Sequence, residues 1–385
     1  MFKPDCRVFE ERREIFFKKL NGKAAIIPSS SLVRHHADCE YPFRQDSNFW
    51  YLTGFDEPDS IALFLSHKPK GERFILFVAP KDILSEVWHG FRWGIEGAER
   101  EFKADKAHSI NEFKDLLPVY IGESEEIVYS IGKHTKIEKI VLEIFSQQQE
   151  ARSRVGIGAN SIKSPEIYLN EMRLIKSDFE INRMREATQI SAEAHELVRE
   201  SISSKKNERQ IQGLIEGFFL EKGARGPAYN SIVASGDNAC ILHYTLNNSE
   251  LNNGDLLLVD AGCSLIDYYN GDITRTFPIG GKFSKEQKLI YEIVLEAQKN
   301  AIKNAVKGSN STNVHNVALR ILVEGLKEIG LLRGDTDGII ENGSYKHLYM
   351  HRTGHWLGLD VHDVGAYRMG EYDVPLQNGM ILTVE

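Results

Sequence analysis

The sequence predicts a two-domain protein in which a mixed-sheet α/β domain precedes a second domain of the α+β class. Its 385 residues are more than one typical domain needs. Residues 1–174 alternate strand-like and helical patterns, and Lys163-Ser-Pro165 breaks the last of these segments. A long helical pattern begins shortly afterwards. We therefore expect domains at 1–174 and 175–385.

Short apolar runs in the first domain predict buried strands, whereas one aromatic segment stays ambiguous. The runs are five residues long and rich in branched or aromatic side chains. The segment 41–55 mixes aromatic and polar residues too closely for a simple core strand. The predicted strands are Ala24–Pro28, Ile61–Leu65 and Phe74–Val78.

The second domain carries several helical patterns with recognisable start and stop signals. Ser177-Asp-Phe-Glu180 is a capping box, in which the Ser side chain and the Glu side chain each satisfy a backbone N–H. Further helices are expected at about 207–222, from Ser284 to before Gly308, and from Ser311 or Thr312 to Gly330. The apolar stripes of these helices are assigned to the core. Strands are expected at 229–235 and at 241–244.

Composition disfavours several classes of partner and location. A net charge of −8 disfavours nucleic acid and anionic membranes. No apolar run reaches the roughly 18 residues that span a bilayer, and the N-terminus lacks an apolar signal region. The four cysteines (Cys6, Cys39, Cys240 and Cys263) show no C-x-x-C spacing, which favours a reducing cytoplasm.

Three histidines lie within twelve residues near the end of the chain, at His351, His355 and His362. Imidazole is the commonest metal ligand and titrates near neutral pH. A zinc-protease helix of the H-E-x-x-H type is excluded, because Arg352 stands where the catalytic Glu is required. Glycines between the histidines also weaken a helix.

Carboxylates elsewhere in the chain can complete a metal site. Asp260 ends the apolar run Leu256–Asp260, and a turn is expected to bring Asp272 onto a second strand, so we expect the two acids to belong to one hairpin. Glu385 ends a third apolar run, which we expect to be a strand. Such an oxygen-rich set with one imidazole favours a hard divalent ion such as Mn²⁺.

These motifs resemble the pita-bread metallopeptidases. Gly271-Asp-Ile-Thr-Arg-Thr-Phe277 and Gly354-His-Trp-Leu-Gly-Leu-Asp-Val-His-Asp363 are most similar to bacterial Xaa-Pro aminopeptidases (the aminopeptidase P family), and the similarity covers nearly the whole chain. The resemblance implies a pita-bread catalytic domain at 175–385 and an aminopeptidase P N-terminal domain at 1–174. It also implies two divalent ions, Mn²⁺ in our interpretation. Their ligands would be Asp260, Asp272, His355 and Glu385, with Asp272 bridging.

The same resemblance assigns the remaining site residues. His243, His351 and His362 are expected to bind the scissile carbonyl, orient the substrate and move a proton. Trp356 and Val361 belong to a segment that could form an apolar wall for proline. Trp88 matches a residue that reaches the active site of a neighbouring subunit in the family, which implies a homo-oligomer.

The implied activity is removal of the N-terminal residue from peptides with proline in second position. One alternative is a prolidase, which cleaves only dipeptides. Another is a pita-bread protein that binds peptides or partners without catalysis. In the family, the pattern continues past the Thr-Val-Glu motif to a second bridging Glu. We therefore expect a catalytic domain without its last strands, which is either a fragment of a longer chain or an enzyme whose activity is weak or absent.

Overall fold

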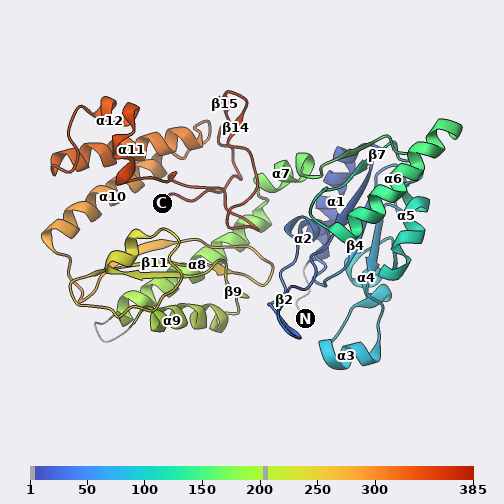
Figure 1. Cartoon of the computed structure of the whole chain (residues 1–385), viewed down its shortest axis with the longest axis horizontal. Helices are drawn as coiled ribbons and strands as arrows, with labels where there is room; N and C mark the ends of the chain where they lie inside the picture. The colour runs from blue at the N-terminus through green and yellow to red at the C-terminus, as the bar shows by residue number, and fades with distance from the viewer. Residues whose placement is uncertain (1–4, 203–206) are drawn as a thin grey trace. The chain divides into compact units, whose positions relative to one another are not determined.

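The computed structural model describes residues 5–202 and 207–385, which form two compact units (Figure 1). The N-terminal unit is Met1–Asn170 and the C-terminal unit is Glu171–Glu385. The division lies inside helix α7 (Glu166–Leu174), shortly before the boundary expected from the sequence. No helix among the described residues is both long and apolar enough to cross a membrane.

The N-terminal unit is built on a six-stranded mixed sheet in the order β6-β5-β4-β1-β7-β8. The strands β1, β4 and β5 pair antiparallel, whereas β1–β7, β5–β6 and β7–β8 pair parallel. The three strands predicted from apolar runs are confirmed with the bounds expected. The strands are β1 Ala24–Pro28, β4 Ile61–Leu65, β5 Phe74–Val78, β6 Lys106–Ser109, β7 Glu126–Val128 and β8 Ser161–Lys163, with a separate hairpin of β2 Arg34–His36 and β3 Cys39–Glu40.

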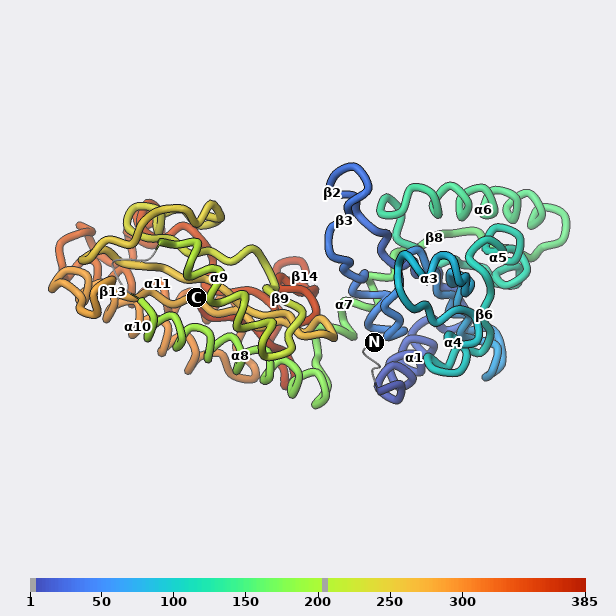
Figure 2. Tube along the Cα trace, turned by 90° about the horizontal axis from the view of Figure 1, so that it is seen from below, coloured from blue at the N-terminus to red at the C-terminus, as the bar shows by residue number. Residues whose placement is uncertain are grey.

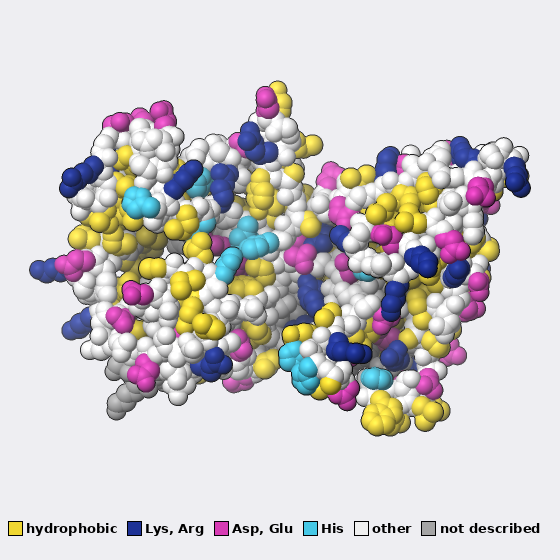
Figure 3. Space-filling model, in the orientation of Figure 1, with side chains coloured by type: hydrophobic (Ala, Val, Ile, Leu, Met, Phe, Trp, Pro, Cys, Tyr) yellow, Lys and Arg dark blue, Asp and Glu magenta, His cyan; other side chains and the backbone are white. Residues whose placement is uncertain are grey.

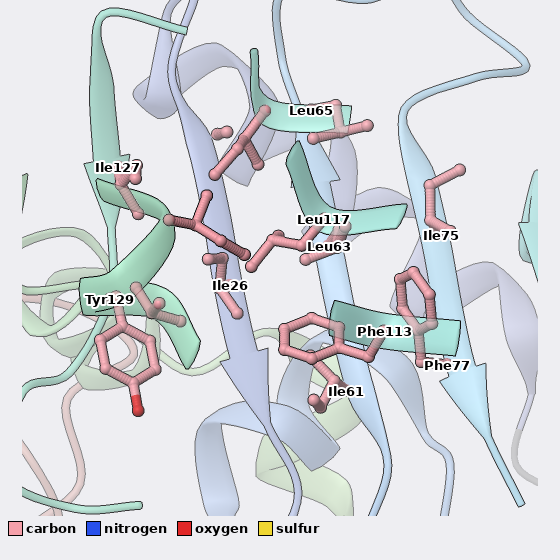
Figure 4. Close-up of a cluster of buried hydrophobic side chains, with 14 of the residues drawn as sticks. Ile26, Ile61, Leu63, Leu65, Ile75, Phe77, Phe113, Leu117, Ile127 and Tyr129 are labelled. Atoms are coloured by element: carbon pink, nitrogen blue, oxygen red, sulfur yellow. The ribbon is translucent and has the colours of Figure 1, made fainter. Parts of the chain in front are cut away.

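Helices cover both faces of this sheet, as Figure 2 shows for α5 and α6 on one side and α1 on the other. Side chains alternate between the faces along β4: Leu63 packs in the cluster with Leu117 of α5 (Figure 4), whereas Phe64 contacts Phe16 of α1. The helices are α1 Cys6–Leu20, α2 Ser47–Thr53, α3 Ile83–His89, α4 Gly94–Phe102, η1 Ile110–Glu112, α5 Phe113–Ile121 and α6 Thr135–Val155.

The aromatic segment 41–55 contains helix α2, which explains why its pattern was ambiguous. All seven side chains of α2 are buried, so the sequence shows no polar face. The Asp46 carboxylate accepts from the backbone N–H of Phe49 at 2.9 Å and caps the helix.

The helices expected in the C-terminal unit are confirmed. The capping box of Ser177 and Glu180 is present at the start of α8. The start of α11 differs in detail, because Asn310, and not Ser311 or Thr312, caps it. The helices are α8 Asp178–Ser201, α9 Glu208–Glu221, α10 Lys285–Asn304, α11 Ser311–Glu328 and α12 Thr336–Asn342, with 3-10 turns η2 Gly236–Cys240 and η3 Ser344–His347.

A three-stranded antiparallel sheet in the order β10-β11-β13 carries the expected hairpin of this unit. Its registers pair Asp260 with Thr274 on one side and with Ile232 on the other. The strands are β9 Gly226–Pro227, β10 Ile232–Ser235, β11 Leu256–Asp260, β12 Cys263–Ser264, β13 Thr274–Pro278, β14 Arg368–Met369 and β15 Tyr372–Asp373.

Two strand predictions are wrong. Residues 241–244 form a turn after η2, because the Tyr244 hydroxyl is bound by a buried carboxylate of α9 and the chain cannot run on along the sheet. Residues 380–385 make a single bridge, Trp356–Leu382, and no regular strand. Short irregular pairing replaces the strand there, because the partner segment 353–357 is itself irregular and contains Gly354.

Candidate metal centre

Three of the expected ligands meet at one point in the C-terminal unit. Ligand atoms of Asp272, His355 and Glu385 all lie within 4.8 Å of one another. The imidazole Nε2 of His355 is 3.1 Å from Asp272 Oδ2 and 3.1 Å from Glu385 Oε1. Asp272 lies two residues before β13, so the expectation that it stands on a strand is wrong: it belongs to the connection that leads into β13. His355 comes from the histidine-rich segment, and Glu385 follows the segment that pairs with it.

Backbone pairing between two distant segments aligns His355 with Glu385. Thr383 N donates to His355 O at 2.9 Å, and Glu385 N donates to Thr353 O at 2.7 Å. A Cβ atom on Gly354 would collide with the Thr383 carbonyl oxygen, so only glycine allows this close approach. Figure 1 shows the end of the chain between the part of the unit with α8, α9 and β11 and the part with α10–α12.

Asp260 joins the cluster through a tyrosine. The Tyr229 hydroxyl lies 2.5 Å from Asp260 Oδ1 and 2.6 Å from Asp272 Oδ1, and it donates its one hydrogen to either carboxylate. The hairpin that carries the two acids is tight, because a Cβ on Gly262 would collide with the carbonyl of Gly271. Four ligand candidates and one hydroxyl therefore form a continuous set.

The electrostatics of the set show carboxylates crowded around one imidazole. Burial raises the pKa of Asp260 to about 6, and the nearby charges of Asp272 and Glu385 add to this rise. Burial would lower the pKa of His355, but its contacts with Asp272 and Glu385 outweigh it and raise that pKa to about 10. Without a metal ion, the protonated imidazole therefore supplies the positive charge among these acids, and a bound cation would take the place of the proton on Nε2.

The donor set fits a divalent cation. Carboxylate oxygens with one imidazole nitrogen are ligands for hard or borderline divalent ions. The second nitrogen of His355, Nδ1, lies 2.9 Å from the Trp356 carbonyl oxygen. A proton on Nδ1 fixes the tautomer in which Nε2 is free to bind metal, an orientation common to metal-binding histidines.

The three histidines expected to assist catalysis lie in different surroundings. The ring of His362 is 4.4 Å from that of His355, centre to centre. His351 is exposed, and its Nδ1 lies 2.7 Å from Arg352 O. His243 is exposed in the turn after η2, and within the described part of the chain it makes no hydrogen bond to the three acids and one histidine of the centre. Histidine side chains are visible on this face of the unit (Figure 3).

The residues expected to bind substrate differ sharply in exposure. Trp356 is 1% exposed, and its ring stacks on Tyr367 with centres 5.0 Å apart. Val361 is half-buried. Trp88 is 83% exposed on α3 of the N-terminal unit. Their substrate roles remain predictions.

Sequence reasoning missed two features that hold the site in place. Tyr229 was taken only as part of a strand, and nothing in its neighbourhood marked its hydroxyl. The buried acid Asp363 accepts from Arg173 at 2.6 Å and from Lys176 at 2.8 Å, and its backbone N–H donates to Trp356 O. The position of Asp363 beside His362 was the available signal for this anchor.

Comparisons with known proteins agree with this geometry. Residues 182–385 match metallopeptidase family M24, and residues 9–129 match the aminopeptidase P N-terminal domain. The chain is 43% identical over 378 residues to an Xaa-Pro aminopeptidase of Haemophilus influenzae, covering 98% of this chain and 85% of that protein.

Solved structures are similar along the whole chain. Pseudomonas aeruginosa aminopeptidase PepP aligns with a TM-score of 0.95 and 38% identity, over 100% of this chain and 87% of that one. A zinc-substituted Escherichia coli aminopeptidase P in complex with product aligns with a TM-score of 0.95 and 36% identity, with the same coverage.

Fold and site together define a pita-bread metallopeptidase that carries a mixed-sheet domain in front of its catalytic domain. Both family matches and the relatives above specify the branch. The chain belongs to the Xaa-Pro aminopeptidases of metallopeptidase family M24. The expected two-domain fold is confirmed.

Proposed function

We propose that the protein removes the N-terminal residue from peptides with proline in second position. The observation that carries the proposal is the cluster of Asp272, His355 and Glu385, with Asp260 joined to it through Tyr229. The similarity to Xaa-Pro aminopeptidases over 98% of the chain supports the substrate class.

We propose that Asp260, Asp272, His355 and Glu385 would hold a pair of Mn²⁺ ions, to which the carboxylate of Asp272 would be a common ligand. The excess of carboxylate oxygen over imidazole nitrogen favours Mn²⁺ over softer ions. When bound, such a pair supplies an activated water at neutral pH. Around this site, the Tyr229 hydroxyl orients the Asp260 and Asp272 carboxylates, and the Trp356 carbonyl orients the His355 ring.

The other histidines act on the substrate in this proposal. His362, against the His355 ring, and the exposed His351 and His243 offer donors for the scissile carbonyl and a route for the proton to the leaving imino nitrogen. The segment 356–361 with Val361 offers the apolar surface for proline. Trp88 is proposed to act in a homo-oligomer, where its exposed ring could meet another copy.

Two alternatives make different predictions. A prolidase would cleave Xaa-Pro dipeptides and leave tripeptides intact, and a binding protein would cleave neither. Similarity to Xaa-Pro aminopeptidases favours the proposed aminopeptidase activity over both alternatives. A cytoplasmic location, and the absence of nucleic acid and membrane partners, stay proposals based on charge and composition.

The test measures binding and hydrolysis of an Xaa-Pro-Xaa tripeptide and of an Xaa-Pro dipeptide, after metal removal and after addition of Mn²⁺. We expect release of the first residue with Mn²⁺ and loss of this activity with a chelator. Cleavage of the dipeptide alone would favour the prolidase, and peptide binding without cleavage would favour the binding protein.

A further inference from the structure

A glutamate at the start of α9 is fully buried, with 0% of its surface exposed. Glu208 Oε1 accepts from Ser235 N at 2.7 Å, Ser235 Oγ at 2.8 Å and Asn238 Nδ2 at 3.1 Å. Its other oxygen, Oε2, accepts from Tyr244 OH at 2.8 Å and Ser249 N at 2.9 Å. Five donors from one segment of chain therefore converge on one carboxylate.

All of these donors belong to residues 235–249, which we call the His243 loop. His243 lies between two of the anchored side chains, Asn238 and Tyr244. The backbone turns tightly there, since Ile241 N donates to Asn238 O at 3.0 Å and Tyr244 N to Ile241 O at 3.2 Å. Within the described residues, His243 itself has no recorded hydrogen bond, so its place depends on these neighbours.

The anchor is suited to a negative charge. Glu208 stands in the first turn of α9, where the helix dipole favours anions. Burial opposes ionisation, but the donors, with the backbone N–H groups of Ser249 and Ser235 foremost, keep the pKa of Glu208 below its usual value. A paired, fully bonded carboxylate holds its partners more firmly than a neutral acceptor would.

Other contacts confine the loop to one arrangement. The Tyr244 ring is buried and packs with Ile232 and Ala234 of β10. Asn247, also fully buried, accepts from Val233 N at 3.0 Å and donates to Ser231 O at 2.8 Å. These contacts hold the loop against β10, and the Glu208 carboxylate joins residues 235, 238, 244 and 249 of the loop.

We propose that Glu208 is a positioning residue, which acts on peptide hydrolysis by holding the loop that presents His243. The proposal rests on the substrate role proposed above for His243. It gives a role to a buried carboxylate at a position where an apolar residue would avoid the cost of desolvation.

The first test is Glu208→Gln. The amide of glutamine replaces one carboxylate oxygen with an NH₂ group, which is a donor. The loop groups that donate to that oxygen therefore lose their acceptor. We expect kcat to fall by about tenfold or more, with KM changed less and metal content unchanged. Hydrogen exchange in residues 236–249 should become faster, while exchange in β11 stays the same.

Measuring the effect of Glu208→Gln in the His243→Ala variant distinguishes positioning of His243 from general destabilisation. If Glu208 acts through His243, the kcat loss from Glu208→Gln should disappear in that background. An equal loss in both backgrounds, or no effect of Glu208→Gln on kcat and on loop exchange, would overturn the proposal. Should His243→Ala leave activity intact, the proposal would fail at its premise.

Tyr244→Phe is the milder variant if Glu208→Gln does not fold. It removes one donor and keeps the ring, so we expect a smaller loss of kcat with the same dependence on His243. The matched control is Glu112→Gln in the N-terminal unit, where the carboxylate accepts from Ser109 N in a capping box. It should leave loop exchange unchanged. If the protein cleaves no Xaa-Pro peptide, the proposed function fails separately, and unchanged loop exchange in Tyr244→Phe and Glu208→Gln would still refute the anchor.

Discussion

The Glu385 carboxylate lies 3.1 Å from the His355 imidazole, at the point where two irregular segments pair. Their alignment depends on the backbone bonds from Thr383 to His355 and from Glu385 to Thr353. The centre is therefore assembled by main-chain contacts, and its geometry should be sensitive to changes that touch no ligand.

Gly354→Ala tests this dependence. The added methyl would collide with the Thr383 carbonyl, so the two segments must separate. We expect about 1–3 kcal/mol less stability in urea denaturation and at least about tenfold weaker Mn²⁺ binding in calorimetry. Gly213→Ala in α9 is the control, because nothing lies within 4 Å of its Cβ position. Equal metal affinity in both variants would contradict the account.

Tyr229→Phe tests the hydroxyl that joins Asp260 and Asp272. Without it the two carboxylates lose a shared donor that orients them. We expect kcat/KM for an Xaa-Pro-Xaa tripeptide to fall about ten- to a hundredfold, with circular dichroism unchanged. Tyr291→Phe on α10 should behave like the wild type. Wild-type kinetics in Tyr229→Phe would show that the hydroxyl has no role.

His355→Ala and His362→Ala separate a ligand from a helper. The first removes a nitrogen that faces two carboxylates, so metal content measured by calorimetry should drop. The second should retain its metal and lose turnover, since its role is assigned to the transition state. Equal loss of metal in the two variants would mean that the roles are wrongly divided.

Features of the fold and the site could be predicted from the sequence where neighbouring residues determine them, and could not where distant residues do. The capping box at Ser177 and the Asp260 strand end are local patterns, and both predictions are confirmed. Residues 241–244 resemble a strand in the sequence because Ile241 and Leu242 are apolar. In the structure these two side chains face solvent, and the turn is held by Glu208, which lies far away in the sequence. Tyr229 depends on two acids far along the chain, so no local pattern could reveal it.

The buried His315 should make the metal-free protein sensitive to acid. Burial, and then the nearby Arg352 and His351, lower the pKa of His315 to about 4. Because the folded pKa is depressed below the unfolded value of about 6.5, stability is complete above that value and falls as pH drops towards 4.

We therefore expect His315→Gln, in excess chelator, to lose less unfolding free energy than the wild type between about pH 7 and about pH 5. Urea titrations across that range measure the slope, and the exposed His89→Gln is the control. Parallel slopes for wild type and His315→Gln would refute the assignment.

Anomalous X-ray scattering at the manganese edge, from crystals soaked in Mn²⁺, tests the central claim most directly. We expect at least one peak within about 2.5 Å of oxygens of Asp272 and Glu385 and of His355 Nε2, and the second ion of the proposed pair next to Asp260. Manganese peaks only at other positions, with His355 still between the two carboxylates, would contradict the metal centre on which the proposed function rests.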